Sequence, residues 1–536
     1  MVSLNIDSIG IIGAGPGGLA SLYEFLHTNK DGTSTVGTGK RAETPAFSKI
    51  VAFEQKDHAG GIWAPATPDA DLPIPPQEIL NTGKFNDPAI IRPRNEPPQE
   101  INGATKETPI VVAVPKSKSK TNDNLQNELE WKRSGVYPYL STNIPSRFTR
   151  FSYLPDEEKY HDKSRPIYPF LYHQELSQRF TDFVNNENLH EFIRLNTTVE
   201  DVYKNEDTGK WIISVRHKNP ITGANEWYQE EFDAIVVANG HYTIPSIPAF
   251  PGLAEFNANY PDVLIHAKSV RELNEFKDKE VLFVGGSIST ANIIQYIIPV
   301  AKSVTISKRS KNLVFDYINR ALVTPEIDQR GEIVKFDPKT GKVHFVANDY
   351  GNGGEPKKFD KIILTTGYHY HYPFLSKYFE VVNPSHLSRV KGLYYHTFNQ
   401  QDPTIGATGI LVSHLNFHTI EASAAALAGV WSGAKELPTL KEQQEWENQE
   451  VETKGDSLFF HFLDHHNAQE HFVDKLYQFA PKNRYNPLEK EGPLVGEVDE
   501  GVDKLEKLFY DIKDKKLGVD DVLLPSLEKL SIELKA

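Results

Sequence analysis

The fold is decided by the stretch Ile9-Gly10-Ile11-Ile12-Gly13-Ala14-Gly15-Pro16-Gly17-Gly18-Leu19, in which an apolar strand runs directly into a glycine-rich turn. Leu19, Leu22 and Leu26 then recur at helical spacing, so the turn opens a helix. Strand, turn and helix in this order are the fingerprint of a dinucleotide-binding unit, because the positive end of the helix dipole faces the pyrophosphate.

The glycines of this turn have separate predicted tasks. Gly13 permits the tight turn, Gly15 lets the backbone approach a pyrophosphate, and Gly18 lets the helix pack on the strand. Gly17 lies beside them in the same turn. We therefore predict that these four glycines bind a cofactor.

An acidic residue follows the second apolar strand, residues 50–53. Glu54 is placed to accept both ribose hydroxyls of an adenosine, and its charge would repel a 2′-phosphate. The acidic residue normally lies ~20 residues beyond the glycines, whereas Glu54 lies 54 − 18 = 36 beyond Gly18. A polar loop at residues 28–47 explains the excess. The site is predicted to take FAD or NAD and to reject NADP.

A looser copy of the fingerprint is Gly285-Gly286-Ser287-Ile288-Ser289-Thr290, which follows an apolar strand at residues 281–284. Ser287 and Thr290 stand at its second and third glycine positions. A serine still permits fairly close backbone approach, and its hydroxyl can hydrogen-bond a phosphate. Gly285, Ser287, Ser289 and Thr290 are therefore candidate cofactor-binding residues.

The strand after this copy, residues 304–306, leads into Lys308 and Arg309. An acidic residue there would indicate NAD, whereas a cation indicates a 2′-phosphate, so NADPH is the predicted nicotinamide. The alternative is a solvated charge cluster on the surface. Two nucleotide sites in one chain indicate a flavin that is reduced by a nicotinamide.

Two apolar strands that end in small residues and glycine bracket the second copy: residues 232–242, which include Asn239, and residues 362–368, which include Thr366 and Gly367. The predicted fold class is α/β with two Rossmann-like dinucleotide-binding domains, the NADPH domain being inserted in the FAD domain. We expect the FAD domain at residues 1–246 and 361–536, and the NADPH domain at residues 247–360.

Three further segments have predicted roles in this plan. A surface insertion is expected at about residues 64–130, with a short strand at residues 110–114, because this part is rich in proline and polar residues. An amphipathic pattern between residues 166 and 193 indicates a helix. Residues 211–215 are expected to form a strand that returns to the first sheet, and a helical tail is expected from residue 438 onward.

The composition of the 536 residues is that of an ordinary globular protein, with 39% hydrophobic and 24% charged residues. The net charge of −14 argues against nucleic acid or an anionic membrane surface as partner. No leader, long apolar run or address tag is evident, so the predicted location is cytoplasmic. The sequence is compatible with a homo-oligomer.

Cysteine is absent, and the only methionine is Met1. Flavoprotein chemistry through a Cys-x-x-Cys dithiol is therefore excluded. Protection from self-oxidation by a peroxide-generating site could explain the depletion, as could economy in a protein made when sulfur is scarce. The second explanation favours an organosulfur substrate. Lineage bias or deliberate engineering of the sequence is the alternative.

Histidines in the second half of the chain could supply metal ligands. His461 and His465 have the i, i+4 spacing that could place both on one helix face. No third ligand has an obvious claim and the neighbours are aromatic, so packing is preferred and no metal is expected. The polar segment at residues 413–418 either lines a substrate or flavin pocket or holds satisfied core histidines.

The motifs occur in an order that resembles flavin-containing monooxygenases, particularly the fungal ones. They are Gly13 to Gly18, Gly60-Gly61-Ile62-Trp63, Thr142-Asn143, Asn239-Gly240-His241-Tyr242, Gly285-Gly286, Thr366-Gly367-Tyr368 and Trp431-Ser432-Gly433. The family's Phe-x-Gly-x-x-x-His identifier is poorly kept. Counted back from His266, Tyr260 replaces the phenylalanine and Asp262 replaces the glycine.

The resemblance implies FAD and NADPH as cofactors and a small molecule and O2 as substrates. NADPH would reduce FAD, oxygen would add at flavin C4a, and one oxygen atom would pass to a soft nucleophile, sulfur or nitrogen. Asn143 is implied as the catalytic residue that hydrogen-bonds near the flavin and the retained NADP⁺, the alternative being a loop-capping asparagine. Further implied cofactor contacts are Gly61, Trp63, Thr142, Asn239, Thr366 and Gly367.

Other functions stay open at this point. A Baeyer–Villiger monooxygenase acting on ketones is the nearest alternative. An NADPH oxidase or redox-sensing flavoprotein would make peroxide without an oxygenated product. A nucleotide-binding interaction module would show no turnover.

Overall fold

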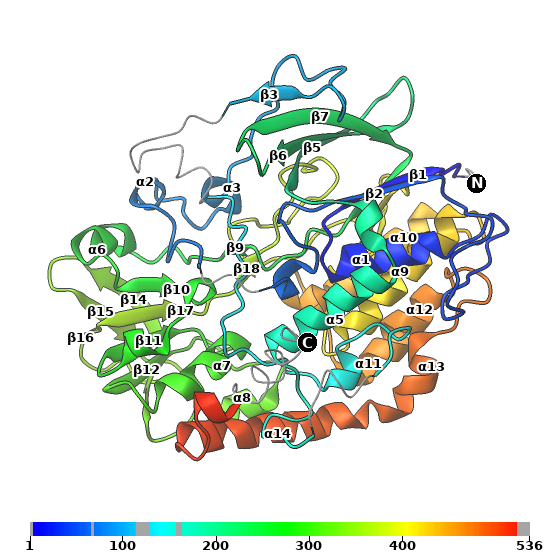
Figure 1. Cartoon of the computed structure of the whole chain (residues 1–536). Coiled ribbons are helices and arrows are strands. Elements are labelled where there is room, and N and C mark those ends of the chain that lie inside the picture. The colour runs from blue at the N-terminus through cyan, green and yellow to red at the C-terminus, as the bar shows by residue number, and fades with distance from the viewer. Residues whose placement is uncertain (1–3, 66–68, 114–128, 157–162, 523–536) are drawn as a thin grey trace.

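The computed structural model describes residues 4–65, 69–113, 129–156 and 163–522. Its two largest sheets each carry one of the glycine-rich turns, and Figure 1 shows the second sheet and its helices at the left of the first. This confirms the predicted α/β class with two Rossmann-like domains.

The first sheet has a parallel centre. Its order is β19 (Leu393–Tyr394), β20 (Phe398–Asn399), β21 (Ile405–Ala407), β8 (Ala234–Val237), β1 (Ser8–Ile12), β2 (Lys49–Phe53) and β4 (Ile193–Arg194). All residues of β1 are buried, and Ile12 is in register with Phe53 of β2 and Val237 of β8. The carboxyl ends of three central strands therefore meet at one edge, where the first turn begins.

Two helices pack against each other on this sheet, α1 (Pro16–Leu26) and α9 (Asn416–Trp431). The buried face of α9 includes a run of small residues, 422–426. These small side chains let α1 approach closely. A helix from late in the chain thus fixes the one that opens the first turn.

The second sheet is parallel throughout. Its order is β10 (Leu264–His266), β17 (Lys361–Leu364), β11 (Glu280–Val284), β12 (Ser303–Ser307) and β13 (Ile327–Arg330). The predicted domain boundary after residue 360 falls just before β17, which pairs with β11. We therefore propose residues 247–366 as the second domain.

Two short strands connect the domains. β9 (Ile244–Pro245) enters the second domain and pairs antiparallel with β18 (Tyr368–His369), which leaves it. The Thr366 hydroxyl donates to the Ser246 carbonyl at 2.5 Å beside this pair. Because β8 precedes the second sheet and β21 follows it in the chain, the second domain is an insertion in the first.

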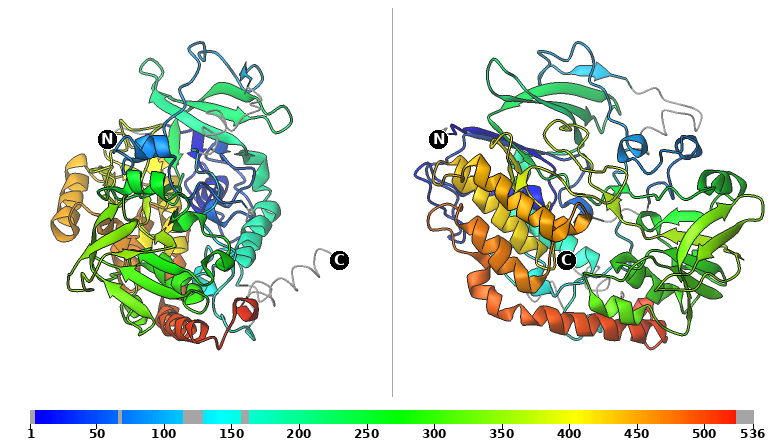
Figure 2. Two further views of the ribbon diagram at one scale, coloured as in Figure 1. Left: turned by 90° about the vertical axis from the view of Figure 1, so that its left-hand side faces the viewer. Right: turned by 180° about the vertical axis from the view of Figure 1, so that it is seen from behind.

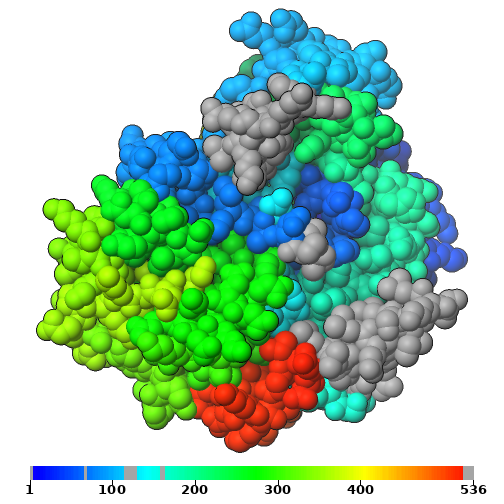
Figure 3. Space-filling model, turned by 60° about the vertical axis from the view of Figure 1, so that its left-hand side comes forward, coloured from blue at the N-terminus to red at the C-terminus, as the bar shows by residue number. Residues whose placement is uncertain are grey.

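The insertion after Trp63 is anchored on the connection between the domains. The buried Lys268 ammonium lies 2.9 Å from Asp71 and also donates to the carbonyls of Trp131 and Thr243. Burial lowers the pKa of Lys268 to about 8, although Asp71 opposes this shift. In Figure 3 the described residues 69–113 of the insertion, in blue to light blue, border the second domain, in green.

A four-stranded antiparallel sheet covers the first domain, with the order β3 (Ile110–Val112), β7 (Asn225–Phe232), β6 (Trp211–Lys218) and β5 (Thr197–Lys204). The strand predicted at residues 110–114 is present as β3, which covers residues 110–112. Residue 114 lies outside the described ranges. The prediction that residues 211–215 return to the first sheet is wrong. Both faces of β6 are buried, and its apolar run reads like that of a central parallel strand although its partners are antiparallel.

A smaller antiparallel sheet and several short helices belong to the two domains. The sheet comprises β14 (Glu332–Asp337), β15 (Lys342–Val346) and β16 (Lys357–Lys358), and β22 (Val412–Ser413) pairs with β23 (Phe462–Leu463). The helices are α2 (Gln77–Leu80), α3 (Pro88–Ile91), α5 (His173–Asn186), α6 (Leu253–Asn259), α7 (Ile288–Ile297) and α8 (Asp316–Ala321). The helix predicted between residues 166 and 193 is present as α5.

The tail is helical, as predicted. It contains α10 (Leu440–Lys454), α11 (His465–Ala468), α12 (Asp474–Tyr477), α13 (Pro487–Glu491) and α14 (Gly496–Lys513). Helix α14 packs against α7 and α8, with ion pairs Arg320–Glu506 at 2.6 Å and Lys513–Glu326 at 2.8 Å. Figure 2 shows it running beneath both domains. No helix in the described ranges combines the length and apolarity that a bilayer crossing needs.

Candidate nucleotide-binding active site

The first turn fits a cofactor that needs close backbone approach. Gly13 has a left-handed φ of +103°, and a Cβ there would lie 2.6 Å from the Ala238 carbonyl oxygen. A Cβ on Gly15 would lie 3.3 Å from Gly61 Cα, so the second glycine meets the Gly-Gly-x-Trp segment. Two predicted motifs that are far apart in the sequence therefore lie in contact.

The amino terminus of α1 has the donors that a phosphate requires. Gly15 is its N-cap, and no side chain of the described residues caps it. The buried Thr408 hydroxyl has no hydrogen-bond partner within the described ranges. It lies beside Gly17, where a Cβ would be only 2.8 Å from the hydroxyl oxygen. The start of α1 thus has uncapped backbone amides with this hydroxyl next to Gly17, and these donors fit a pyrophosphate. Thr408 escaped sequence reasoning, because it follows β21, far along the chain from the turn.

Glu54 is buried directly beside the turn. One of its carboxylate oxygens accepts the Ala14 N–H and the other accepts the Lys56 N–H, both at 2.9 Å. These two bonds fix the carboxylate at the carboxyl end of β2 and leave lone pairs for further donors. The ribose contact that the sequence assigns to Glu54 stays a prediction.

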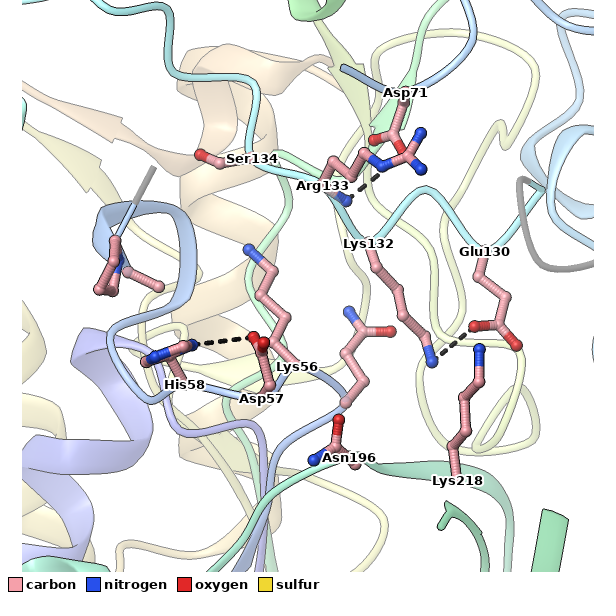
Figure 4. Close-up of a pocket in the computed structure, with 13 residues that line it drawn as sticks. Lys56, Asp57, His58, Asp71, Glu130, Lys132, Arg133, Ser134, Asn196 and Lys218 are labelled. Atoms are coloured by element: carbon pink, nitrogen blue, oxygen red, sulfur yellow. Dashed lines mark hydrogen bonds and ion pairs between the residues drawn. The ribbon is translucent and has the colours of Figure 1, made fainter. Parts of the chain in front are cut away.

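A cavity of about 310 Å³ opens next to Glu54. The turn at residues 55–58 lines one side of it, and Glu130 and residues 132–134, at the end of the insertion and just beyond it, line the other. Figure 4 shows Lys132 directed at Glu130, and the two atoms of that ion pair are 2.5 Å apart. Lys56, at the same cavity, donates to the Gly61 carbonyl at 2.8 Å. Charged side chains line the cavity, and Lys56 joins it to the Gly-Gly-x-Trp segment.

The Thr142–Asn143 motif lies near the same segment. The Trp63 ring stacks on His173 with centroids 6.1 Å apart, and His173 opens α5. Thr142 donates its backbone N–H to the Leu171 carbonyl at 2.7 Å, and its hydroxyl donates to the Ile144 carbonyl. Thr142 therefore holds the loop, while the half-buried Asn143 side chain forms no hydrogen bond within the described ranges. An amide held without a partner is available for a ligand.

The loop before Asn143 also reaches the second domain. The Tyr139 ring lies 4.9 Å from that of Tyr296 on α7 and 4.8 Å from that of Tyr137. The buried hydroxyls of Tyr137, Tyr139 and Tyr172 have no partner within the described part of the chain. Asn143 is thus carried by a segment that contacts both domains. Sequence reasoning missed these tyrosines, whose spacing carries no motif.

The second turn repeats the geometry of the first. Gly285 has a φ of +117°, and a Cβ there would lie 2.7 Å from the Thr365 carbonyl oxygen. Ser287 is the N-cap of α7, but its hydroxyl accepts from Asn312 Nδ2 at 3.1 Å and does not cap the helix. The helix amides are again left for an anion. Ser289 lies half-buried in the first turn of α7, and Thr290 is buried.

Lys308 stands in the second domain where Glu54 stands in the first, one residue beyond the strand next to the turn. Its aliphatic stem lies over Gly286, where a Cβ would be 2.7 Å from Lys308 Cδ. Burial lowers the pKa of the Lys308 ammonium, which has no partner within the described ranges. Arg309 is exposed. A buried, unpaired cation fits an incoming phosphate.

Three predicted contacts lie at the crossing between the domains. Asn239 Nδ2 donates to the His371 carbonyl at 3.3 Å, beside the point where Ala238 meets Gly13. Thr366 bonds Ser246, and Gly367 accepts from the Ser246 N–H. Thr366 and Gly367 therefore hold the connection between the domains, and cofactor contact by these residues stays a prediction.

The divergent identifier contains a left-handed residue. Asp262, at the glycine position of the identifier, has a left-handed φ of +65°, a region that aspartate tolerates. His266 Nε2 donates to the Gly367 carbonyl at 3.1 Å, while its Nδ1 accepts the Lys268 N–H. The motif is part of the connection between the domains.

The histidine pair of the tail does not share a helix face. His461 ends a 3-10 turn and lies 3.0 Å from His396, whereas His465 begins α11 beyond β23. The interpretation as an i, i+4 pair is therefore wrong, because β23 breaks the helix between them. His414 and His418 are buried and bond to Val314, His465 and Glu491.

The chain is similar in sequence to several known proteins. The model of the flavin-binding monooxygenase-like family matches residues 123–327. Trimethylamine monooxygenase of Methylocella silvestris is 27% identical over 84% of this chain and 81% of its own length. Flavin-containing monooxygenase ustF2 of Aspergillus flavus is 25% identical over 90% of this chain and 94% of its own length.

Solved structures show the same fold. The S-allyl-L-cysteine S-oxygenase of Allium sativum aligns with a TM-score of 0.63 at 21% identity, covering 99% of this chain and all of that one. Tmm from Pelagibacter aligns with a TM-score of 0.62 at 19% identity, over 95% of this chain and 91% of that one. The chain is similar to flavin monooxygenases over most of its length, and its residues 123–327 match the model of the flavin-binding monooxygenase-like family. It is an oxidoreductase, and the family uses FAD and NADPH.

Proposed function

We propose that this chain is an NADPH-dependent flavin monooxygenase that transfers one oxygen atom from O2 to a nucleophilic sulfur or nitrogen of a small molecule. The observation that carries the proposal is the Asn143 amide. It has no partner within the described ranges, and it lies on the segment that contacts both nucleotide-binding domains.

The first domain would hold FAD. Uncapped amides of α1 and the Thr408 hydroxyl would bind the pyrophosphate, and Glu54 would accept the ribose hydroxyls. The second domain would hold NADPH, with the amides of α7 on its pyrophosphate and Lys308 on its 2′-phosphate. When bound and reduced by NADPH, FAD would supply the two electrons that activate O2, so that one oxygen atom passes to the substrate and the other leaves as water.

The protein's own groups would then orient and protect that chemistry. The Asn143 amide can donate to one cofactor and accept from the other, which would keep the nicotinamide in place after it has given up its hydride. The buried tyrosine rings would exclude water from the junction between the domains.

Two observations support sulfur or nitrogen as the atom attacked. The relative from Methylocella silvestris is named for an amine substrate, and a thioether offers a nucleophilic lone pair as an amine does. The chain itself contains no cysteine, and its only methionine is Met1. The protein therefore has few sulfur atoms that its own oxidising active site could damage.

The test is Asn143→Ala, with Asn185→Ala on the exposed end of α5 as the matched control. The Asn143 variant should bind FAD like the wild type but release most of the NADPH-derived electrons as hydrogen peroxide. Oxygen consumption, peroxide and product are measured together. Unchanged product per NADPH in Asn143→Ala would refute the role.

The substrate class is tested with panels of thioethers, amines and ketones at equal concentration. The proposal expects product from thioethers or amines. Product from ketones alone would instead indicate Baeyer–Villiger chemistry, and peroxide without product on every panel would indicate an oxidase.

A further inference from the structure

A chain of hydrogen bonds links the second domain to the tail through two histidines. His414 Nε2 lies 3.1 Å from the Val314 carbonyl, and His414 Nδ1 lies 2.8 Å from His465 Nδ1. His465 Nε2 in turn lies 2.9 Å from Asp499 Oδ1, in the first turn of α14. His466 Nε2 lies 3.5 Å from the same oxygen.

The positions of the hydrogens in this chain follow from its ends. A carbonyl can only accept, so His414 Nε2 carries hydrogen and donates to Val314. The backbone N–H of His465 donates to His414 Nδ1 at 3.3 Å, so this nitrogen accepts. His414 therefore carries its ring hydrogen on Nε2 and its lone pair on Nδ1.

Because His414 Nδ1 accepts, His465 Nδ1 must donate to it. A neutral His465 then carries its lone pair on Nε2, directed at a carboxylate oxygen 2.9 Å away. Two lone pairs at this distance repel each other. A cation must lie between His465 and Asp499, and it is either a proton or a metal ion.

We infer that His465, His466 and Asp499 form a binding site for a divalent transition-metal ion such as Zn²⁺. The three ligand atoms all lie within 4.8 Å of one another. Ligand atoms of a tetrahedral zinc lie about 3.3 Å apart, given Zn–N and Zn–O bonds of about 2.0–2.1 Å. The separations of 2.9 and 3.5 Å from Asp499 Oδ1 bracket that value. A proton would serve one histidine, whereas a metal ion serves both.

The surroundings have further features of a metal site. The hydrogen bond from His465 Nδ1 to His414 fixes the tautomer that leaves Nε2 free for the metal, as partners of metal-bound histidines commonly do. His465 is buried, while His466 and Asp499 are exposed, so an ion can enter from solvent and keep a water ligand. Imidazole and carboxylate ligands suit zinc among the first-row metals.

Such a site would join two helices. His465 and His466 begin α11, and Asp499 lies in α14, which packs against α7 and α8 of the second domain. A bound ion would therefore fasten the helix that runs beneath both domains, and it should raise the melting temperature.

The test is calorimetric titration of ZnCl2 into untagged, chelator-treated holoenzyme. Because the chain has no cysteine, no thiolate competes for the ion. We expect one zinc per wild-type chain, and at least about tenfold weaker binding in Asp499→Asn and in His466→Gln. His471→Gln, which removes an exposed histidine outside the cluster, is the control and should bind like the wild type.

A second readout separates this site from scattered surface binding. Zinc should raise the melting temperature of the wild type and of His471→Gln but not of the two ligand variants. Absence of wild-type binding, wild-type affinity in either ligand variant, or equal loss in His471→Gln would overturn the inference. None of these outcomes depends on the oxygenation reaction.

Discussion

The two glycine-rich turns have the same backbone course but keep different glycines. The first glycine is present in both, and for the same reason. Gly13 and Gly285 are left-handed. A Cβ on either would lie within 2.7 Å of a carbonyl oxygen just after the neighbouring strand, that of Ala238 or Thr365. Their N–H groups donate to Phe53 and Ser307 at 2.8 and 3.0 Å. The turn itself therefore dictates this glycine.

The second glycine depends on what lies opposite. Gly15 and Ser287 are both extended N-caps, with ψ of −170° and −165°, so the conformation does not require glycine at either. A Cβ on Gly15 would meet Gly61, whereas the Ser287 side chain is exposed and bonds Asn312. The first turn favours glycine here, because a Cβ would press on the Gly-Gly-x-Trp loop.

The third glycine depends on how closely the helix approaches the turn. A Cβ on Gly18 would lie 1.9 Å from the Gly13 carbonyl oxygen. In the second domain the Thr290 hydroxyl lies 3.0 Å from the Gly285 carbonyl and 2.7 Å from the Thr365 hydroxyl. In the second domain the helix therefore leaves room for the Thr290 side chain, which hydrogen-bonds to the turn. In the first domain the helix lies too close to the turn for any side chain at Gly18.

The largest expected effect is that of Gly18→Ala, which tests this difference. Helix α1 cannot move away, since α9 packs against it, so the variant should lose at least about 3 kcal/mol of unfolding free energy and retain little FAD. Thr290→Ala removes only hydrogen bonds and should cost about 1 kcal/mol, with full flavin content.

Flavin content per chain after gel filtration, together with urea unfolding followed by flavin fluorescence, measures both effects. Wild-type flavin content in Gly18→Ala would break the comparison, because it would show that the helix can shift at no cost.

The amino-acid sequence predicts the two turns well, but it does not predict which strands pair beside them. Each turn, its helix and the residue after the second strand are local features, so the sequence alone predicts Glu54 and Lys308 at equivalent positions. Pairing partners are not local. Residues 234–237 and 361–364 are both apolar strands that lead to a glycine, yet β8 joins the first sheet and β17 the second.

The same limit applies to the site. Thr408 reaches the first turn only because β21 pairs with β8, and the tyrosines near Asn143 meet only when the domains pack. Neither contact leaves a periodic pattern in the chain. The residues that sequence reasoning missed are those that arrive from distant strands.

An intermediate effect is expected from Glu54→Gln, which sharpens the comparison at the first turn. The neutral amide accepts through only one atom and cannot satisfy the N–H groups of Ala14 and Lys56 together with a ribose. FAD affinity should fall about 10- to 100-fold, since a hydrogen bond to a charged group contributes about 1.5–3 kcal/mol. Reconstitution of apoprotein, followed by flavin fluorescence, measures this.

The control for this change is Glu43→Gln, an exposed glutamate in the loop before β2. It should bind FAD like the wild type. Equal affinity in Glu54→Gln and Glu43→Gln would mean that Glu54 only closes the turn and does not contact the cofactor.

The smallest expected effect is that of Lys308→Ala, which tests whether the second turn is specific for a 2′-phosphate. Loss of this cation should raise the KM for NADPH about tenfold, equivalent to about 1.4 kcal/mol, and leave the KM for NADH nearly unchanged. Lys302→Ala, which removes an exposed lysine just before the start of β12, is the matched control.

Steady-state oxidation of both nucleotides distinguishes two roles of Lys308. Its stem covers Gly286, so a purely structural role would weaken NADPH and NADH alike, whereas a phosphate contact weakens only NADPH and does so less at high salt.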